Sequence, residues 1–366
     1  MEYERPQYLD PSVKTKRVKM PFGPHSAVAP AFDTPITPRE NFRRCISRQN
    51  PLWLPNSLTD NLTLNTNDVI SSPVRGMQIH SDFHRIPTED YQFKDWFNTD
   101  WTWVCSAGGA MLTPGTQLLD DITKWEKMVE FPNLSEWGFE EKADEFKKTT
   151  YDPAKAVSYD IGRGVTERLV SIMGGYVDAM EALIVEPEAV ADFFETYTDF
   201  MIRVFDYLNA LYPFDMITLH DDWGTERDTF FSEKVMEELV FDPTKRLIDH
   251  IRARGVFLEM HTCGNVTRFF PYITKLNCDI AQVQRRAVDM PKMKELYGDK
   301  IGFCAMLEGI DMTKPPEPEE YMNAVRKTVD IYAPGGGSYL MMFTPDEELL
   351  WNACTESYYR SRKIYA

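Results

Sequence analysis

Two features are missing from this chain, and each excludes a class of protein. No apolar run approaches the roughly 18 residues that a membrane-spanning helix requires. No basic run occurs either, and the formal net charge of −17 argues against nucleic acid and anionic membranes as partners. The first residues lack the charged and then apolar pattern of a signal peptide. We therefore expect a cytoplasmic protein that binds neither membranes nor nucleic acid.

A disulfide framework and a dinucleotide-binding motif are also missing. The six cysteines stand singly, as Cys45, Cys105, Cys263, Cys278, Cys304 and Cys354. In a chain of 366 residues this spacing fits a reducing compartment rather than a set of disulfides. No Gly-x-Gly-x-x-Gly sequence follows the first apolar run, which disfavours a nucleotide-binding doubly wound sheet.

What is present is an alternation of short apolar runs with helical patterns, which is typical of an α/β protein. The eight runs are 51–55, 100–105, 169–174, 216–221, 256–261, 279–284, 301–307 and 338–343. Helical spacing is found at 38–44, where Thr37 is the expected cap, and at 186–210, 232–254, 266–275, 290–297 and 318–333.

Eight such runs favour a (β/α)8 TIM barrel over an open sheet. We expect residues 1–40 to form an irregular N-terminal arm, and residues 41–366 to form a single barrel. The segment 113–168 is longer than an ordinary connection and is predicted to be an excursion from the barrel, such as a lid.

Catalytic residues of such barrels lie at the carboxyl ends of the strands. The polar or turn residues at these expected ends are Asn56, 105–106, 174–176, 220–223, 261–263, 284–285, 308–309 and 343–344.

His261 and Cys263 follow one apolar run at a spacing of two residues. Side chains alternate along an extended strand, so both are expected to point to the same side. Imidazole and thiolate are good zinc ligands, and two ligands at a strand end suggest a catalytic site with an open position. The residues alone leave open that Cys263 is only a small buried apolar residue.

Several spaced motifs together resemble the uroporphyrinogen decarboxylase superfamily. They are His-Asp-Asp-Trp-Gly at 220–224, Ser232-Glu233 with Pro243 in the following helix, His-Thr-Cys-Gly-Asn at 261–265, Leu-Glu-Gly-Ile-Asp at 307–311, and three glycines at 335–337. The resemblance runs from about residue 38 to the end, and it is strongest between 169 and 345.

The resemblance implies either a tetrapyrrole decarboxylase or a zinc-dependent methyltransferase that works with a corrinoid protein. The decarboxylases of the superfamily bind a polycarboxylate through arginines after the first strand, and this chain has none at 52–57. Related thiol methyltransferases carry another cysteine at the end of strand eight, where this chain has Phe343 and Thr344. Glu308 is the expected third zinc ligand, since Cys304 lies deeper in its strand.

Fewer thiolates leave zinc a stronger Lewis acid, which suits the cleavage of an ether. The expected activity is therefore O-demethylation of an aromatic methyl ether, with the methyl group passing to cob(I)alamin on a separate corrinoid protein. Transfer from methylcobalamin to a thiol, a decarboxylase, and a non-catalytic barrel that binds a corrinoid protein remain open.

The expected roles of the other site residues follow from this activity. Asp221 or Asp222 would protonate the leaving oxygen or orient a ligand, and helix capping is an equally good interpretation of both. The substrate pocket would contain Trp53, Asn56, Tyr176, His220, Trp223 and Met342. The sequence Asp82-Phe83-His84 matches the start of a corrinoid-binding motif, but Pro87 replaces its glycine, so the corrinoid is expected on the partner.

Overall fold

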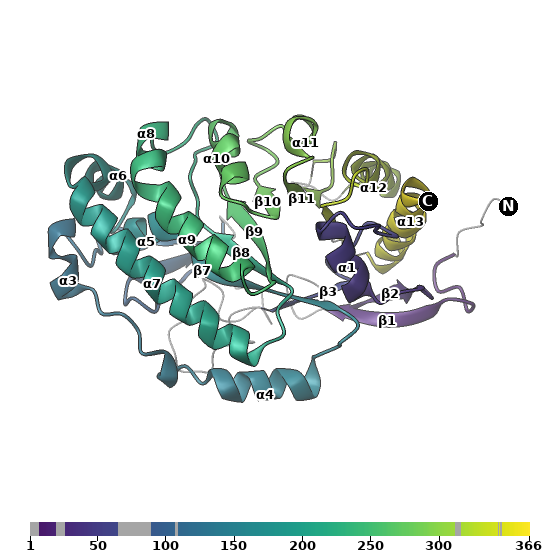
Figure 1. Ribbon diagram of the computed structural model, residues 1–366. Helices are drawn as coiled ribbons and strands as arrows, with labels where there is room; N and C mark the ends of the chain where they lie inside the picture. The colour runs from purple at the N-terminus through teal and green to yellow at the C-terminus, as the bar shows by residue number, and fades with distance from the viewer. Residues whose placement is uncertain are drawn as a thin grey trace.

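The computed structural model describes residues 7–19, 26–64, 89–106, 109–311, 316–342, 344 and 346–366. Within these residues one curled parallel sheet of seven strands forms the centre of the molecule (Figure 1). Its strands, in spatial order, are β12 (Tyr339–Met341), β11 (Gly302–Met306), β10 (Ile280–Val283), β9 (Phe257–Thr262), β8 (Met216–His220), β7 (Ala156–Arg163) and β3 (Asn61–Leu64).

The eighth position of the barrel is filled by a short irregular segment. Asn56 forms a parallel bridge with Leu340 of β12. The Leu340 amide donates to the Pro55 carbonyl at 2.7 Å, and the Ser57 amide donates to the Leu340 carbonyl at 2.9 Å. A turn then leads directly into β3. The predicted TIM-barrel fold is confirmed, with residues 55–57 in place of a regular first strand.

Helices surround the sheet largely where the helical spacing predicted them. Those of the second half are α7 (Pro187–Leu211), α8 (Glu233–Val235), a π-helical turn η3 (Met236–Val240), α9 (Phe241–Arg252), η4 (Thr267–Phe269), α10 (Phe270–Lys275), α11 (Met290–Tyr297), α12 (Pro318–Tyr332) and α13 (Glu347–Tyr365). Figure 1 shows α7 and α9 lying outside the strands. Within the described ranges, no helix has the length and hydrophobicity to cross a membrane.

Two of the predicted barrel strands are wrong. Residues 169–174 belong mostly to α5 (Val165–Ile172), and 100–105 contain β5 (Asp100–Val104) of a separate antiparallel sheet with β4 (Tyr91–Lys94) and β6 (Gly109–Leu112). The barrel strands in their place are β3 and β7. Every residue of α5 is buried, so its sequence has the apolar density of a strand, whereas β7 carries polar residues toward the barrel interior.

The excursion is longer than predicted and begins earlier. It separates β3 from β7 and contains the β4–β6 sheet, η1 (Ile122–Lys124), α3 (Trp125–Met128), η2 (Leu134–Glu136) and α4 (Phe139–Thr149). Aromatic side chains attach it to the barrel: the rings of Trp96 and Trp137 lie 4.8 Å apart, and Phe97 packs edge-on against Phe200 of α7. This segment is a side layer against α7. Residues 82–87, which carry the Asp-x-His sequence, lie outside the described residues.

The N-terminal arm is more regular than predicted. β1 (Lys14–Lys19) and β2 (Ser26–Ala31) form an antiparallel ribbon that packs on α13. Just after β2, Phe32 stacks on Tyr358 with ring centroids 4.2 Å apart. Alternate small residues of β2, including Ala27 and Ala29, are buried against the helices, so the ribbon contributes to the core between α12 and α13.

Helix α1 (Pro38–Ile46) closes the amino end of the barrel, and Thr37 caps it as predicted. Phe42 and Ile46 pack against the first inward residues of several strands. Asp215, which precedes β8 and is fully buried, holds α1 in this position at the amino end of the barrel. Its carboxylate lies 2.9 Å from Arg39 Nε and 2.8 Å from Arg43 Nη1, and it accepts from the Val157 amide at 3.0 Å.

Replacement of Asp215 by alanine should destabilise the fold by roughly 3 kcal/mol, because it leaves two arginines and a buried amide without their acceptor. Denaturant unfolding of the variant measures this loss. Asp330→Ala, which breaks an exposed pair with Arg360, is the matched control and should cost less than about 1 kcal/mol. Equal losses in the two variants would contradict the role assigned to Asp215.

Candidate metal centre

The site is built by the register of three neighbouring parallel strands. His220 of β8 pairs with His261 of β9, and His261 pairs with Gln282 of β10. Residues in register on adjacent strands point to the same face of a sheet. The three side chains therefore meet at the carboxyl end of the barrel, where the fold places catalytic residues.

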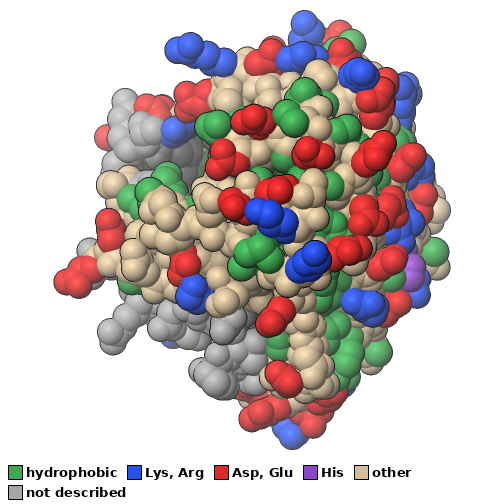
Figure 2. All heavy atoms as spheres, turned by 90° about the vertical axis from the view of Figure 1, so that its left-hand side faces the viewer, with side chains coloured by type: hydrophobic (Ala, Val, Ile, Leu, Met, Phe, Trp, Pro, Cys, Tyr) green, Lys and Arg blue, Asp and Glu red, His purple; other side chains and the backbone are tan. Residues whose placement is uncertain are grey.

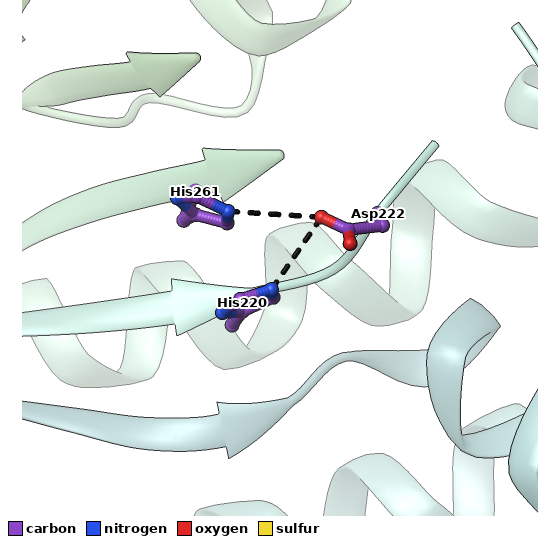
Figure 3. A group of neighbouring side chains, drawn as sticks. All are labelled: His220, Asp222 and His261. Carbon is purple, nitrogen blue, oxygen red and sulfur yellow. Dashed lines mark ion pairs between the residues drawn. The ribbon is translucent and has the colours of Figure 1, made fainter. Parts of the chain in front are cut away.

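Three potential ligand atoms, from His220, Asp222 and His261, lie within 4.8 Å of one another there, and Cys263 lies beside His261. Asp222 Oδ1 lies 3.4 Å from His220 Nε2 and 3.7 Å from His261 Nε2, and Cys263 Sγ lies 3.4 Å from His261 Nε2. Figure 3 shows both imidazoles projecting from their strands toward the Asp222 carboxylate. Tetrahedral zinc ligands are separated by about 3.3–3.8 Å, given bonds of about 2.0–2.3 Å. The donor types and spacings fit a zinc ion.

His261 is held in the tautomer that a metal requires. Its Nδ1 contacts Gln282 Oε1, while Gln282 Nε2 donates to Glu259 Oε2 at 3.0 Å. The amide oxygen can only accept, so Nδ1 carries the proton and Nε2 keeps its lone pair. Burial, and then the neighbouring His220, lower the pKa of His261 to about 4, so its ring is neutral. Gln282 is thus placed as the outer partner that a metal-binding histidine at 261 would need.

His220 is surrounded by carboxylates. Burial alone would lower its pKa, but Glu167, Asp160 and Asp222 together raise that pKa well above the ordinary value. The nearest atoms of Asp160 and Glu167 lie 3.6 and 3.9 Å from its ring nitrogens. The same carboxylates that stabilise a proton on His220 would also stabilise a metal cation there. To bind the cation, the His220 ring must first lose that proton.

Asp222 and Cys263 are linked through the backbone. The Cys263 amide donates to Asp222 Oδ1 at 2.7 Å. Burial raises the pKa of Asp222, but the hydrogen bond and charge of His220 outweigh it and hold that pKa below its usual range. Burial and the Asp222 charge raise the pKa of the Cys263 thiol to about 12, and a cation bound beside it would lower that pKa.

The turns that carry these ligands pack directly on one another. Gly264 has φ of +83°, and a Cβ added to it would lie 2.1 Å from the backbone of Gly224. The Asn265 amide donates to the Thr225 carbonyl at 2.6 Å. The two motifs at 220–224 and 261–265 thus form one unit, and glycine is required at 264 by both conformation and space.

Asp221 and Trp223 have structural surroundings. Asp221 is fully buried and accepts from Thr166 Oγ1, the Glu167 amide and Trp223 Nε1 at the start of α5. These bonds are those of a helix cap. Trp223 is completely buried and packs edge-on against Phe269, so the structure does not place it at the expected substrate pocket.

Tyr176 lies at the mouth of the site. It begins α6 (Tyr176–Val185), is 39% exposed, and stacks on Phe230 with ring centroids 4.3 Å apart. Burial, followed by the charges of Glu167 and Asp222, raises the pKa of its hydroxyl. The Phe230 amide donates to the Trp223 carbonyl at 2.8 Å, which ties the stacked pair to the turn that carries Asp222. Among the predicted substrate contacts, His220 belongs to the cluster, and Tyr176 stacks on Phe230 in the loop that follows Asp222.

The remaining predicted residues contact other partners. Glu308 accepts from Tyr332 Oη at 2.8 Å and is buried against α12. Met342 is buried among the helices outside the sheet. The Trp53 indole donates to Asp60, and Asn56 Nδ2 contacts Cys354 of α13. The structure therefore does not bring these four residues together with His261, because each is engaged by other parts of the fold.

Four residues near the cluster were missed by the sequence analysis, among them Asp160, whose carboxylate lies 3.6 Å from His220 Nδ1. Gln282 could have been noticed, because it interrupts an apolar run two residues before its expected end. Arg163 and Glu167, paired at 2.6 Å, were hidden inside the segment interpreted as an excursion. Burial raises the pKa of Glu167 to about 7 against the opposing effect of Arg163, whose guanidinium lies over the ring of Trp101.

Comparison with known families supports the resemblance in part of the chain. Residues 168–343 match the family model described as uroporphyrinogen decarboxylase (URO-D). This range includes all four candidate ligands. No curated protein sequence matches the chain.

Solved structures with a similar arrangement are remote. A methyltransferase from Methanosarcina mazei has a TM-score of 0.49 and 13% identity, over 70% of this chain and 73% of that one. An endo-1,4-β-xylanase from Caldicellulosiruptor owensensis has a TM-score of 0.32 and 11% identity, over 61% and 75%. A xylose isomerase-like TIM barrel protein from Mycobacterium smegmatis has a TM-score of 0.32 and 12% identity, over 62% and 78%. At these scores they identify neither family nor reaction.

Gln282→Leu should weaken zinc binding by about 10- to 100-fold, because His261 loses the acceptor that fixes its tautomer. Zinc affinity is measured by competition with a chromophoric chelator. Glu308→Gln is the control, since its carboxylate bonds to Tyr332, and it should leave the affinity unchanged. A larger loss in Glu308→Gln than in Gln282→Leu would overturn this ligand set.

Gly264→Ala should both destabilise the protein and reduce its zinc content, since the added methyl group must separate the two ligand turns. We expect a loss of roughly 2 kcal/mol or more in unfolding free energy. Gly115→Ala is the control, because it has a similar φ of +78° but open space around its Cβ position. Metal analysis and thermal unfolding of both variants separate the packing effect from backbone strain.

Proposed function

We propose that this chain is a zinc-dependent methyltransferase that demethylates an aromatic methyl ether and passes the methyl group to cob(I)alamin on a separate corrinoid protein. The observation that carries the proposal is the convergence of His220, Asp222 and His261 at the carboxyl end of the barrel, with Cys263 Sγ 3.4 Å from His261 Nε2. The family match over residues 168–343 supports it, because that range contains this cluster.

The four residues supply one thiolate, one carboxylate and two imidazoles toward zinc. When bound, zinc supplies a Lewis acid at the barrel mouth that can polarise an ether oxygen. The side chains also orient one another, because Gln282 fixes the His261 tautomer and the Asp222 carboxylate faces both imidazoles. We assign Asp222 to holding the cation. Asp221, occupied by the α5 cap, is not a candidate proton donor.

The reaction balances without an oxidant. Transfer would form a cobalt–carbon bond and break the methyl carbon–oxygen bond, whose electron pair would stay on the phenolate oxygen and take up a proton from water. The stacked rings of Tyr176 and Phe230 form an aromatic surface at the entrance. The outer face of this pair suits packing against the ring of an aryl ether.

Transfer of a methyl group from methylcobalamin to a thiol is the second candidate function. The methyl donor that the protein accepts distinguishes the two functions. The purified protein, reduced cobalamin and zinc are mixed with an aryl methyl ether, methanol or a methylthiol, and methylcobalamin is followed by its absorbance. We expect the aryl ether to be the preferred donor. Decarboxylation of a porphyrinogen, with no donor alkylating cobalamin, would overturn the proposal.

His261→Ala should lower the rate of cobalamin methylation by about 100-fold or more, because it removes a ligand of the electrophile. Chelator treatment of the unchanged protein should cause a similar loss that added zinc reverses. Zinc should not restore the variant. Full activity of the metal-free protein would show that the cluster has another purpose.

A further inference from the structure

Helix α6 begins at the mouth of the site and leaves large apolar side chains exposed to solvent. Val177 is 79% exposed, Ile184 67% and Val185 60%. Its first residue, Tyr176, forms the aromatic surface at the entrance with Phe230. Exposed apolar side chains gathered on one element, rather than scattered singly, indicate an interaction surface. The helix that carries this surface begins at Tyr176, the residue that stacks on Phe230.

An acidic hollow lies beside the same helix. Its apolar lining includes Ile122, Met173 and Val185, and its acidic lining consists of Asp120, Asp121, Asp178, Glu181 and Glu186. Lys124 lies next to the hollow and pairs with Asp120 at 2.9 Å. Figure 2 views the side of the molecule where α3 and α6 lie, and shows acidic side chains gathered among hydrophobic ones.

We propose that the exposed face of α6, with this acidic hollow, is the docking surface for the corrinoid protein, and that it binds a surface patch combining apolar and basic side chains. The inference rests on the proposed function for the identity of the partner. The apolar residues match the core of a protein interface, and the carboxylates match a polar rim that selects a basic partner.

The negative charge of this surface favours a basic partner protein over a second copy of the chain as its occupant. A symmetric contact through α6 would bring the carboxylates of two copies together. Like charges in such an arrangement oppose association, and the chain as a whole carries a net charge of −17. A basic partner gains from the same charges, and its encounter rate should fall as salt is added.

The position of the surface suits transfer of a methyl group. A partner seated on α6 covers the side of Tyr176 that faces solvent and lies next to the mouth of the barrel. The cobalt nucleophile must reach the substrate methyl carbon at that mouth, so docking beside it shortens the path and excludes water from the site.

The test compares Ile184→Lys with Leu296→Lys. Leu296 is 52% exposed on α11, away from α6, and is the matched control. The partner probe is a cobalamin-loaded corrinoid protein purified from the same organism, and the second probe is free cobalamin. Binding of the corrinoid protein is measured by calorimetry, and methyl transfer to each probe is measured by absorbance.

We expect Ile184→Lys to weaken binding of the corrinoid protein by about 10-fold or more, a loss equal to roughly 1.4 kcal/mol, while Leu296→Lys leaves it unchanged. Transfer to free cobalamin should be the same in both variants and the unchanged protein. Added salt should weaken binding to the unchanged protein. Double replacement Asp178→Asn with Glu181→Gln should reduce that salt dependence.

Failure of the docking proposal is distinct from failure of the proposed function. If free cobalamin is methylated but the two lysine variants bind the corrinoid protein equally well, the docking surface is wrong and the function stands. If no donor methylates free cobalamin, the function fails, and binding that Ile184→Lys selectively weakens would still support this surface. Self-association of the unchanged protein that Ile184→Lys abolishes would assign the surface to a second copy instead.

Discussion

The site depends on the parallel register of β8, β9 and β10. That register places His220, His261 and Gln282 side by side, although helices separate them in the sequence. A shift of one residue in any of these strands would turn its side chain from the interior to the helices. The buried network below them, in which Glu259 accepts from Thr218, Gln282 and Tyr339, ties β8, β9, β10 and β12 to the same alignment.

The two ends of the barrel have different roles. The amino end is closed by α1 and fixed by Asp215, with an apolar plug that includes Phe42 and Ile46. The carboxyl end carries polar side chains that remain partly accessible, with His220 and Asp222 exposing 32% and 20% of their side chains. Stability and chemistry are thus separated along the barrel axis, as is usual for this fold.

The second half of the fold could be predicted from the sequence because its strands are short apolar runs between amphipathic helices. The predicted helix at 290–297 matches α11, and five of the predicted runs overlap barrel strands. The first half could not be predicted in this way. β7 carries Ser158, Asp160 and Arg163, whereas α5 is buried throughout, so the apolar run lies on the helix rather than on the strand.

The candidate site shows the same division. His261 and Cys263 could be paired from their spacing, because period-two alternation is local. The other candidate ligands come from other parts of the chain. Whether such a side chain is available for a metal depends on whether another element already forms a hydrogen bond with it. Glu308 looked suitable by position, but Tyr332 of α12 takes its carboxylate. Asp221 and Asp222 are adjacent, yet only Asp222 faces the imidazoles, because Asp221 caps α5.

The contact between Gly224 and Gly264 has a thermodynamic consequence. Because the two ligand-bearing turns are already locked together, the conformational entropy of arranging the donors is lost when the chain folds rather than when an ion arrives. Release of an ion from such a preorganised cradle would require the whole unit to loosen. Under ion scarcity, the folded population rather than local flexibility would then govern how much of the protein stays loaded.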